Sequence, residues 1–292
     1  MTTLICFGFG YSARHWFDAY GGRFARTYGT VTEAAHAAAL NATAVPGFTA
    51  LAFDGSAASP DLREAAAHAD AVLTSVPPDT AGDPVLAACA EALARAKLSS
   101  VVYLSSVGVY GNYDGAWVDE ESACHPVKDH NARRVVAERA WRDFGARAGV
   151  PVAILRLAGI YGPGRSALDN VRQGKARRIA KPGQVFNRIH VADVAQAIEA
   201  AFERRADGIF NVTDDAPTPP GDPIVYAAGL LGVAPPPEVP FAEARKSMSA
   251  FAASFYTDVK RVRNDKMKAA LGVTLKYPTY REGLAALSAS ER

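Results

Sequence analysis

Small residues with the spacing of a phosphate-binding turn lie near the start of the sequence. The segment Gly8-Phe-Gly10-Tyr-Ser12-Ala13 directly follows the apolar run 4–7 and leads into a helix. In this context Gly8 permits a tight turn, Gly10 lets backbone N–H groups approach a pyrophosphate, and Ala13 lets the helix pack against the strand. The helix N-terminus then attracts the anion. The segment predicts a site for NAD or NADP; the alternative is a strand-to-helix turn that holds no ligand.

The end of the second predicted strand, within residues 28–33, should decide between NAD and NADP. An acidic side chain there bonds the ribose 2′-hydroxyl of NAD and repels the extra phosphate of NADP. Glu33 has that place in the sequence, but it is equally interpreted as a first-turn helix residue with a structural role. Thr30 and Thr32 could instead bond a 2′-phosphate, with Arg14 as the charged partner. The residues favour NADP slightly, and NAD stays open.

Three polar residues end other predicted strands and are expected beside the cofactor. They are Asp54, Ser75 and Ser105. Ligands of open α/β sheets bind outside the carboxyl ends of the strands, which is where these side chains would lie. Asp54 is expected on the adenine side, and its alternative is a turn-forming Asp-Gly pair with Gly55.

The elements that must position these residues alternate between short β-rich runs and longer, alanine-rich helical stretches. This alternation is typical of βαβ units with a parallel sheet. Six strands are predicted, at 4–7, within 25–32, and at 49–53, 71–75, 101–105 and 152–155. Helices are predicted at 61–69, 84–97, 131–148, 224–231 and 264–271. In the helix 131–148, Val135, Val136, Ala140 and Phe144 are expected to face the sheet.

The fold class predicted is therefore α/β, a Rossmann doubly wound parallel sheet with a smaller C-terminal substrate lobe. Regular alternation fades after about residue 159, where glycine and proline interrupt basic segments. We expect a cofactor domain over 1–160, to which part of the later chain returns, and a lobe that is mainly substrate-binding over 161–292.

Composition excludes several classes of function. Hydrophobic residues make up 49% of the 292 residues and charged residues 21%, as in a globular protein. A net charge of +2 provides no general field for nucleic acid or an anionic membrane. The three cysteines form no zinc or redox motif, and the first apolar run is too short for a signal peptide. We expect a cytoplasmic protein without a metal site, with a homodimer left open.

Four further motifs carry a family resemblance. They are Val102-Tyr-Leu-Ser-Ser-Val-Gly-Val-Tyr-Gly111, Arg156-Leu-Ala-Gly-Ile-Tyr-Gly-Pro-Gly164, Arg188-Ile-His-Val-Ala-Asp-Val194 and Asn211-Val-Thr-Asp-Asp215. Together they make the chain resemble the extended short-chain dehydrogenase/reductases, or NAD-dependent epimerase/dehydratase family. The resemblance implies a Rossmann sheet that binds NAD(P), a C-terminal lobe that closes over a substrate, and chemistry by hydride transfer.

The catalytic residues that the resemblance implies are not all of the usual type. The family uses Ser or Thr with Tyr-x-x-x-Lys, in which lysine lowers the pKa of the tyrosine and tyrosine exchanges a proton with the substrate. Ser106 matches the hydroxyl position. His130 and Arg134 fall on the tyrosine and lysine positions, so the chain resembles an atypical branch.

This substitution leaves three interpretations of the site. A neutral imidazole exchanges protons near pH 7, so His130 could replace the tyrosine, while Arg134 bonds ribose hydroxyls or orients a substrate. Tyr110 could instead supply the missing phenol, or contact the substrate, or simply pack. The third interpretation is that catalysis is lost and the protein binds the cofactor as a sensor or scaffold.

The substrate side is expected after Gly162, with Tyr161, Arg188 and His190 as contacts. Seven basic residues lie between Gly162 and Arg188, where the family resemblance places the phosphates of a nucleotide-sugar. A solvated basic face explains most of them equally well. The predicted function is an NAD(P)-dependent oxidoreductase or epimerase/dehydratase acting on a small polar molecule, for which a nucleotide-sugar is one option.

Overall fold

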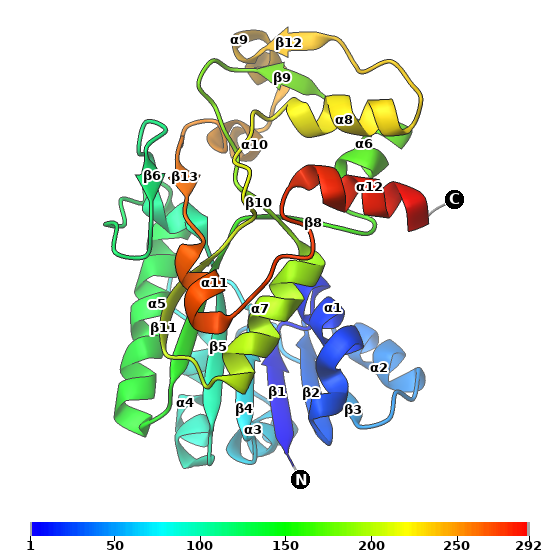
Figure 1. Cartoon of the computed structure of the whole chain (residues 1–292). Helices are drawn as coiled ribbons and strands as arrows, with labels where there is room; N and C mark the ends of the chain where they lie inside the picture. Colours follow the sequence, from blue (N-terminus) through cyan, green and yellow to red (C-terminus); the bar gives the residue numbers. More distant parts are fainter. Residues whose placement is uncertain (1, 291–292) are drawn as a thin grey trace.

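The computed structural model describes residues 2–290 and is built around one parallel sheet (Figure 1). Its strands pair in the order β11-β7-β5-β4-β1-β2-β3, and every pairing is parallel. The strands are β1 (Thr3–Phe7), β2 (Arg26–Val31), β3 (Phe48–Ala52), β4 (Ala71–Thr74), β5 (Ser100–Ser106), β7 (Val152–Leu157) and β11 (Gly208–Val212). The predicted Rossmann fold class is confirmed.

The central strands are apolar because both faces of the sheet are covered. All residues of β4 and β7 are buried, and so are the last four of β1. The strand order reverses at β1, since β2 and β3 lie on one side of it and β4, β5, β7 and β11 on the other. A reversal of this kind opens a crevice at the carboxyl ends of the strands, which is the usual ligand site of such sheets.

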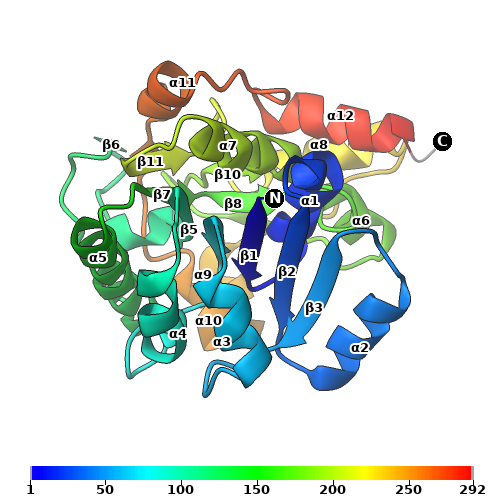
Figure 2. The same ribbon diagram turned by 90° about the horizontal axis from the view of Figure 1, so that it is seen from below.

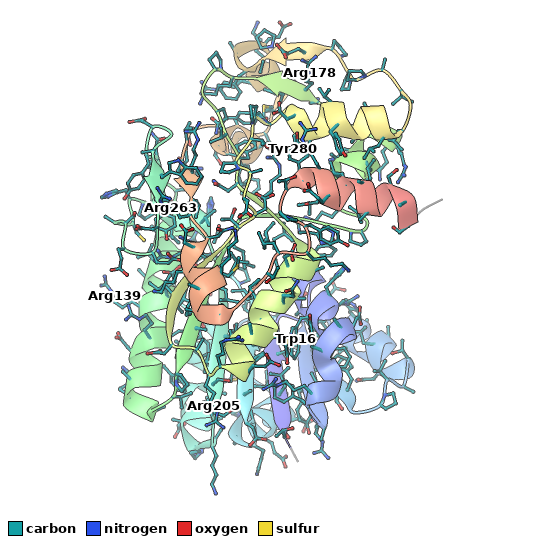
Figure 3. The ribbon with its side chains drawn as sticks, viewed as in Figure 1. Trp16, Arg139, Arg178, Arg205, Arg263 and Tyr280 are labelled. Carbon is teal, nitrogen blue, oxygen red and sulfur yellow. The ribbon has the colours of Figure 1, made fainter. Side chains whose placement is uncertain are left out.

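Helices cover the two faces of the sheet (Figure 2). One face carries α1 (Tyr11–Tyr20) and α7 (Val191–Glu203), with α11 (Asp265–Leu271) beside α7. The other carries α3 (Pro60–Ala67), α4 (Pro84–Arg95) and α5 (Asp129–Ala148), while α2 (Ala34–Ala42) packs at the β3 edge. Trp16 of α1 is buried beneath α7 and donates a hydrogen bond to Glu199 (3.1 Å; Figure 3).

The face that α5 presents to the sheet differs from the prediction. Val136 is 60% exposed, whereas Ala137, Glu138, Trp141 and Phe144 are buried. The pattern of apolar residues predicts the wrong buried face because the inner face of α5 also contains a charged residue, Glu138.

A smaller group of elements lies above the carboxyl ends of the strands (Figure 1). It contains three two-stranded parallel ladders, β8 with β10, β9 with β12 and β6 with β13. Their bounds are β6 (Trp117–Val118), β8 (Gly159–Tyr161), β9 (Arg178–Ala180), β10 (Arg188–His190), β12 (Glu238–Pro240) and β13 (Arg261–Val262). The helices are α6 (Ala167–Arg172), α8 (Asp222–Leu230), α9 (Phe241–Ala244), α10 (Ala250–Ser254) and α12 (Tyr280–Ser290).

Part of the later chain returns to the main sheet, since α7 and β11 belong to it. The strand β11 and the helix α12 have no counterpart among the elements predicted from sequence. Short 3₁₀ turns complete the structure at Gly21–Arg23, Val107–Tyr110 and Arg245–Ser247. Within residues 2–290, the helices are all too short or too polar to cross a bilayer.

Candidate functional site

A cavity of about 800 Å³ lies between the carboxyl ends of the strands and the smaller group of elements. Its lining comes from the end of β5, the start of α5, the β7–α6 segment, the chain before β10, and the segment 251–260. Tyr280 at the start of α12 also lines it and contacts the ring of Tyr226 on α8 (5.9 Å between centroids; Figure 3). The cavity therefore lies at the carboxyl ends of β5 and β7, on one side of the strand-order reversal at β1.

The glycine-rich turn is fixed by two hydroxyl groups. Gly8 has φ +84°, and its N–H donates to Thr30 Oγ1 (2.9 Å) while Ser75 Oγ donates to its carbonyl (2.8 Å). A Cβ on Gly8 would lie 2.6 Å from Ser75 Oγ, so this position excludes larger residues. Thr30 is 1% exposed, and the prediction that its hydroxyl bonds a 2′-phosphate is wrong because that hydroxyl holds the turn.

The turn fits a dinucleotide pyrophosphate. A Cβ on Gly10 would meet no atom of residues 2–290 within 4 Å, so the space above Gly10 can accept a ligand. Gly10 is the N-cap of α1 and supplies no side-chain acceptor, and the first turn contains no acidic residue. Ala13 is 1% exposed and allows α1 to lie close to the sheet. The N–H groups at this end, including that of Ser12, are available to an anion.

Two basic side chains lie beside the end of β2. Arg14 Nη2 contacts His36 Nε2 (2.8 Å), and Arg14 Nε donates to the carbonyl of Phe9 (3.2 Å). Glu33 is the exposed N-cap residue of α2, directly after Thr32, and it makes no side-chain cap. Farther along the sheet edge, Asp54 accepts hydrogen bonds from the N–H and hydroxyl of Ser56, as in the turn alternative.

Ser105 and Ser106 point to opposite faces because successive strand residues alternate. Ser106 lines the cavity, and its Oγ accepts from the N–H of Gly108 (3.0 Å). Ser105 is 5% exposed and donates to Glu138 instead. The predicted cofactor contact of Ser105 is therefore wrong, since its hydroxyl belongs to a buried polar cluster with Glu138 and Arg156.

His130 and Arg134 both reach the cavity from the first two turns of α5. Arg134 Nη1 donates to the carbonyl of Leu104 near the end of β5 (3.1 Å), and the His130 ring lies 6.0 Å from that of Phe251. Burial and then the charges of Lys128 and Arg134 lower the pKa of His130 below its usual 6.5. The imidazole is consequently neutral at pH 7.

Tyr110 does not supply a catalytic phenol. It is fully buried, donates to Asn211 Oδ1 (2.7 Å) and packs its ring under the Arg156 guanidinium (4.8 Å). Burial raises the pKa of Tyr110 to about 12. The 3₁₀ turn after Ser106 directs this ring into the core, so its catalytic or substrate-binding prediction is wrong.

The three residues predicted on the substrate side have different roles. Tyr161 and Arg188 line the cavity. The Arg188 side chain bonds Thr218 Oγ1 (2.6 Å) and the carbonyl of Phe186 through Nη1. His190 is 4% exposed, and its Nδ1 accepts from the N–H of Ala192 (3.1 Å) as the N-cap of α7. Its predicted substrate contact is wrong because the ring is enclosed by those of Tyr161 and Tyr277.

The burial of His190 predicts acid sensitivity. Burial lowers the pKa of His190 to about 4 from 6.5, so the proton binds the unfolded chain more tightly. Neutral His190 makes its full contribution to the free energy of unfolding above pH 6.5. This contribution falls between pH 6.5 and 4, by about 3 kcal/mol in all. His190→Asn keeps an N-cap acceptor and should lose less stability on acidification, measured by urea unfolding at about pH 7.5 and 5. Equal losses in both proteins would refute this account.

Most of the basic segment is solvated or paired away from the cavity. Arg165 and Arg188 are the basic side chains between Gly162 and β10 that line it. Arg178 pairs with Glu238 (2.9 Å), and Arg177 donates to Ser247 (3.1 Å). Most of these basic residues therefore form a surface face and do not line the cavity.

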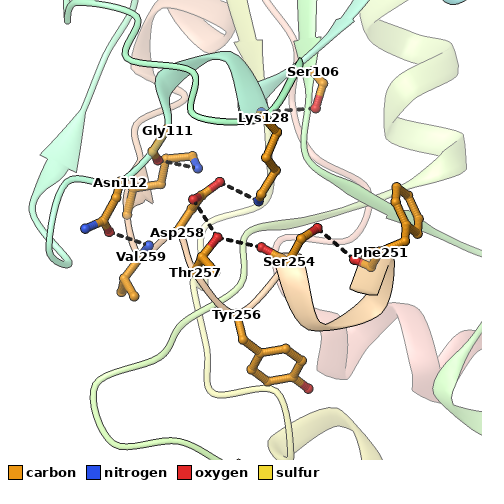
Figure 4. A network of polar contacts seen from close by, with 12 residues as sticks. Ser106, Gly111, Asn112, Lys128, Phe251, Ser254, Tyr256, Thr257, Asp258 and Val259 are labelled. Carbon is orange, nitrogen blue, oxygen red and sulfur yellow. Dashed lines mark hydrogen bonds and ion pairs between the residues drawn. The ribbon is translucent and has the colours of Figure 1, made fainter. Parts of the chain in front are cut away.

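Three charged cavity residues were not predicted. Lys128, Asp258 and Lys260 line the cavity, and Lys128 Nζ contacts Asp258 Oδ2 (2.7 Å; Figure 4). Lys128 lies 130 residues before Asp258 in sequence, and none of the three belongs to a motif. Only the tertiary fold, in which the strand β13 pairs with β6, brings them together.

Comparison with known proteins relates part of the chain to a family. The model of the NAD-dependent epimerase/dehydratase family matches residues 83–213. Over the full length of both chains, a functionally unknown conserved protein from Silicibacter pomeroyi is similar at 43% identity and a TM-score of 0.87. A putative NAD-dependent epimerase/dehydratase from Methylobacillus flagellatus is 25% identical, with a TM-score of 0.72, over all of this chain and 98% of that one. Residues 83–213 therefore form an NAD-dependent epimerase/dehydratase domain.

A reductase is among the curated proteins that are similar to part of this chain. The 3-diazoavenalumate denitrifying reductase of a Streptomyces species is 34% identical over 137 residues, which is 45% of each chain. The match thus spans about half the length of this relative. The chain has the glycine-rich turn, and Ser106, His130 and Arg134 all line the cavity.

Proposed function

We propose that the protein is an NAD(P)-dependent enzyme that transfers hydride to or from a small polar substrate. The observation that carries this proposal is the meeting of Ser106, His130 and Arg134 at one cavity next to the glycine-rich turn. Tyr11, the residue after Gly10, connects the two, because its hydroxyl donates to the carbonyl of Pro163 (3.1 Å) and Arg165 of the cavity lies over its ring (5.7 Å).

Each of the three side chains has a role in this proposal. When bound, the dinucleotide supplies or accepts the hydride. Ser106 orients the substrate oxygen by a hydrogen bond, and His130 exchanges a proton with that oxygen, accepting one when a carbinol is oxidised. Arg134 cannot exchange a proton at neutral pH and binds ribose hydroxyls or orients the substrate.

The cofactor preference that we propose is for NADP. Arg14 provides a guanidinium at the end of β2 and bonds His36 Nε2, whereas the exposed Glu33 makes no side-chain cap on α2. A guanidinium binds phosphate through charge-assisted hydrogen bonds. The matching family model is described as NAD dependent. NADP differs from NAD by one 2′-phosphate, so the proposed preference concerns only the contacts to that phosphate.

Arg14→Ala tests the preference. We expect this change to weaken NADPH binding about 10–100-fold by removing charge-assisted hydrogen bonds to the 2′-phosphate, while NADH binding changes little. Both dissociation constants are measured by calorimetry. Arg95→Ala removes an equal charge at the exposed end of α4 and is the matched control. It should change neither the dissociation constant of NADH nor that of NADPH. Equal weakening of NADH and NADPH in Arg14→Ala would contradict the role.

The reaction class is tested with cofactor deuterated at C4 of the nicotinamide. Aldehydes, ketones, unsaturated acids and nucleotide-sugars are each incubated with the protein and the labelled cofactor, and deuterium in the product is measured by mass spectrometry. Transfer to any substrate class supports the enzyme. Tight cofactor binding without transfer to any of them would favour the alternative, a sensor or scaffold whose shape responds to the nucleotide.

A further inference from the structure

The segment 251–260 brings one lysine and two aromatic rings to one end of the cavity, where Lys128 at the start of α5 also lies. Lys128, Lys260, Phe251 and Phe255 all line it. This end is built by long-range contacts, since Lys260 Nζ donates to the carbonyl of Gly111 (2.8 Å), in the turn that begins at Ser106. The turn from Ser106 to Gly111 therefore joins this end of the cavity to the proposed reaction centre.

Lys260 is a buried cation that lacks sufficient partners. Its side chain is 6% exposed, and in the described part of the chain its Nζ has the Gly111 carbonyl as hydrogen-bond acceptor. An ammonium has three donors, and a buried charge is costly unless it is paired. Burial lowers the pKa of Lys260 to about 8, with Asp258 raising it and Lys128 lowering it. A bound anion would satisfy the remaining donors.

The net charge at this end of the cavity complements a ligand with one negative charge. Lys128 is 15% exposed and Asp258 8% exposed, and their 2.7 Å contact largely neutralises both. Protonated Lys260 then leaves a net charge of about +1, which complements a carboxylate better than a phosphate dianion or a diphosphate.

The rings beside these charges suit an aromatic body. Phe251 is 63% exposed and Phe255 50% exposed, although both line the cavity, and their rings meet edge to face (5.0 Å). The Lys128 ammonium lies 5.8 Å from the Phe255 ring centroid. In Figure 4, Phe251 and Asp258 come from the same segment of chain, and Lys128 reaches Asp258 from a separate element. Exposed rings gain free energy when a flat apolar ligand covers them.

We propose that this end of the cavity binds an aromatic carboxylate as substrate, with its carboxylate on Lys260 and Lys128 and its ring against Phe251 and Phe255. The proposal rests on the proposed function and names the substrate class of the same site. It differs from the nucleotide-sugar option, which requires contacts for two phosphates.

Calorimetric titration with trans-cinnamate and benzoate, in the presence of NADP⁺, tests the proposal without requiring turnover. The uncharged isosteres cinnamamide and benzamide should bind about tenfold more weakly or worse. Lys260→Met should abolish this difference, whereas Lys97→Met, at the exposed end of the α4–β5 connection, should retain it. Phe255→Ala should weaken acid and amide alike. Thermal unfolding of each variant shows that it is folded, and Lys260→Arg provides a second variant that retains the charge and should retain the preference for the acid.

Proton uptake gives an independent readout. At pH 8 Lys260 is about half protonated in the free protein, so binding of cinnamate should take up about half a proton, measured in buffers of different ionisation enthalpy. Uptake should disappear in Lys260→Met. Equal affinity for acid and amide, or tight binding of UDP-glucose with none of either acid, would overturn the proposal. Failure of the proposed function is distinguishable, because it would appear as absence of cofactor binding or of deuterium transfer.

Discussion

Replacing His130 by alanine should lower the turnover number about 10²–10⁴-fold, because the variant loses the group that exchanges a proton with the substrate oxygen. Cofactor affinity should stay within about twofold of the wild type, since Arg134 and the glycine-rich turn remain. The turnover number is measured by cofactor absorbance with the substrate that accepts deuterium, and the dissociation constant by calorimetry.

His68→Ala is the matched control, because His68 is an exposed residue at the end of α3 and bonds only locally. It should leave both quantities unchanged. The pH dependence provides a second check: the lowered pKa of His130 predicts that oxidation of a carbinol falls with a pKa below 6.5, as the imidazole becomes protonated. Unchanged turnover in His130→Ala would remove this residue from the mechanism.

Glu138→Ala should destabilise the fold by about 3–5 kcal/mol, because it leaves the Arg156 guanidinium buried without its counter-charge. Both side chains are 4% exposed and lie 2.7 Å apart, and Ser105 also donates to Glu138. Urea unfolding measures the loss as a lower midpoint with an unchanged slope.

The exposed pair Glu91 and Arg95 is the control for this effect. Its side chains are 91% and 65% exposed, so Glu91→Ala should cost less than about 1 kcal/mol. The double change Glu138→Leu with Arg156→Met should recover much of the stability, since it removes both buried charges. A loss in Glu138→Ala no greater than that in Glu91→Ala would show that the buried pair does not act as described.

Local pattern was sufficient to predict the Rossmann sheet except for its edge strand β11. Apolar runs fully buried on both faces and the glycine-rich turn directly after β1 are signals carried by adjacent residues. The same reasoning failed for Thr30, Ser105, Tyr110 and His190, whose polar groups are used to hold the fold. Sequence shows that such a residue is near a site, but not whether its donor or acceptor is already occupied.

The charged end of the cavity could not be predicted for a different reason. Lys128 and Asp258 meet in a region where β13 pairs with β6, and this ladder has two residues in each strand. So short a strand has no periodicity to recognise. Glu138 is a related case, since one buried charge in an otherwise apolar helix face shifted the predicted face of α5.

The most direct test of the account is calorimetric titration of nucleotide-free protein with NAD⁺, NADH, NADP⁺ and NADPH, repeated with Gly10→Val. Gly10 has φ −94°, and a Cβ there would meet no atom within 4 Å in residues 2–290, so the variant should fold normally. We predict that the wild type binds the NADP pair more tightly and that Gly10→Val weakens binding about 100-fold or more, because valine fills the space of the pyrophosphate. No binding of any nucleotide by the wild type, or equal binding by Gly10→Val, would contradict the cofactor site and the enzyme built on it.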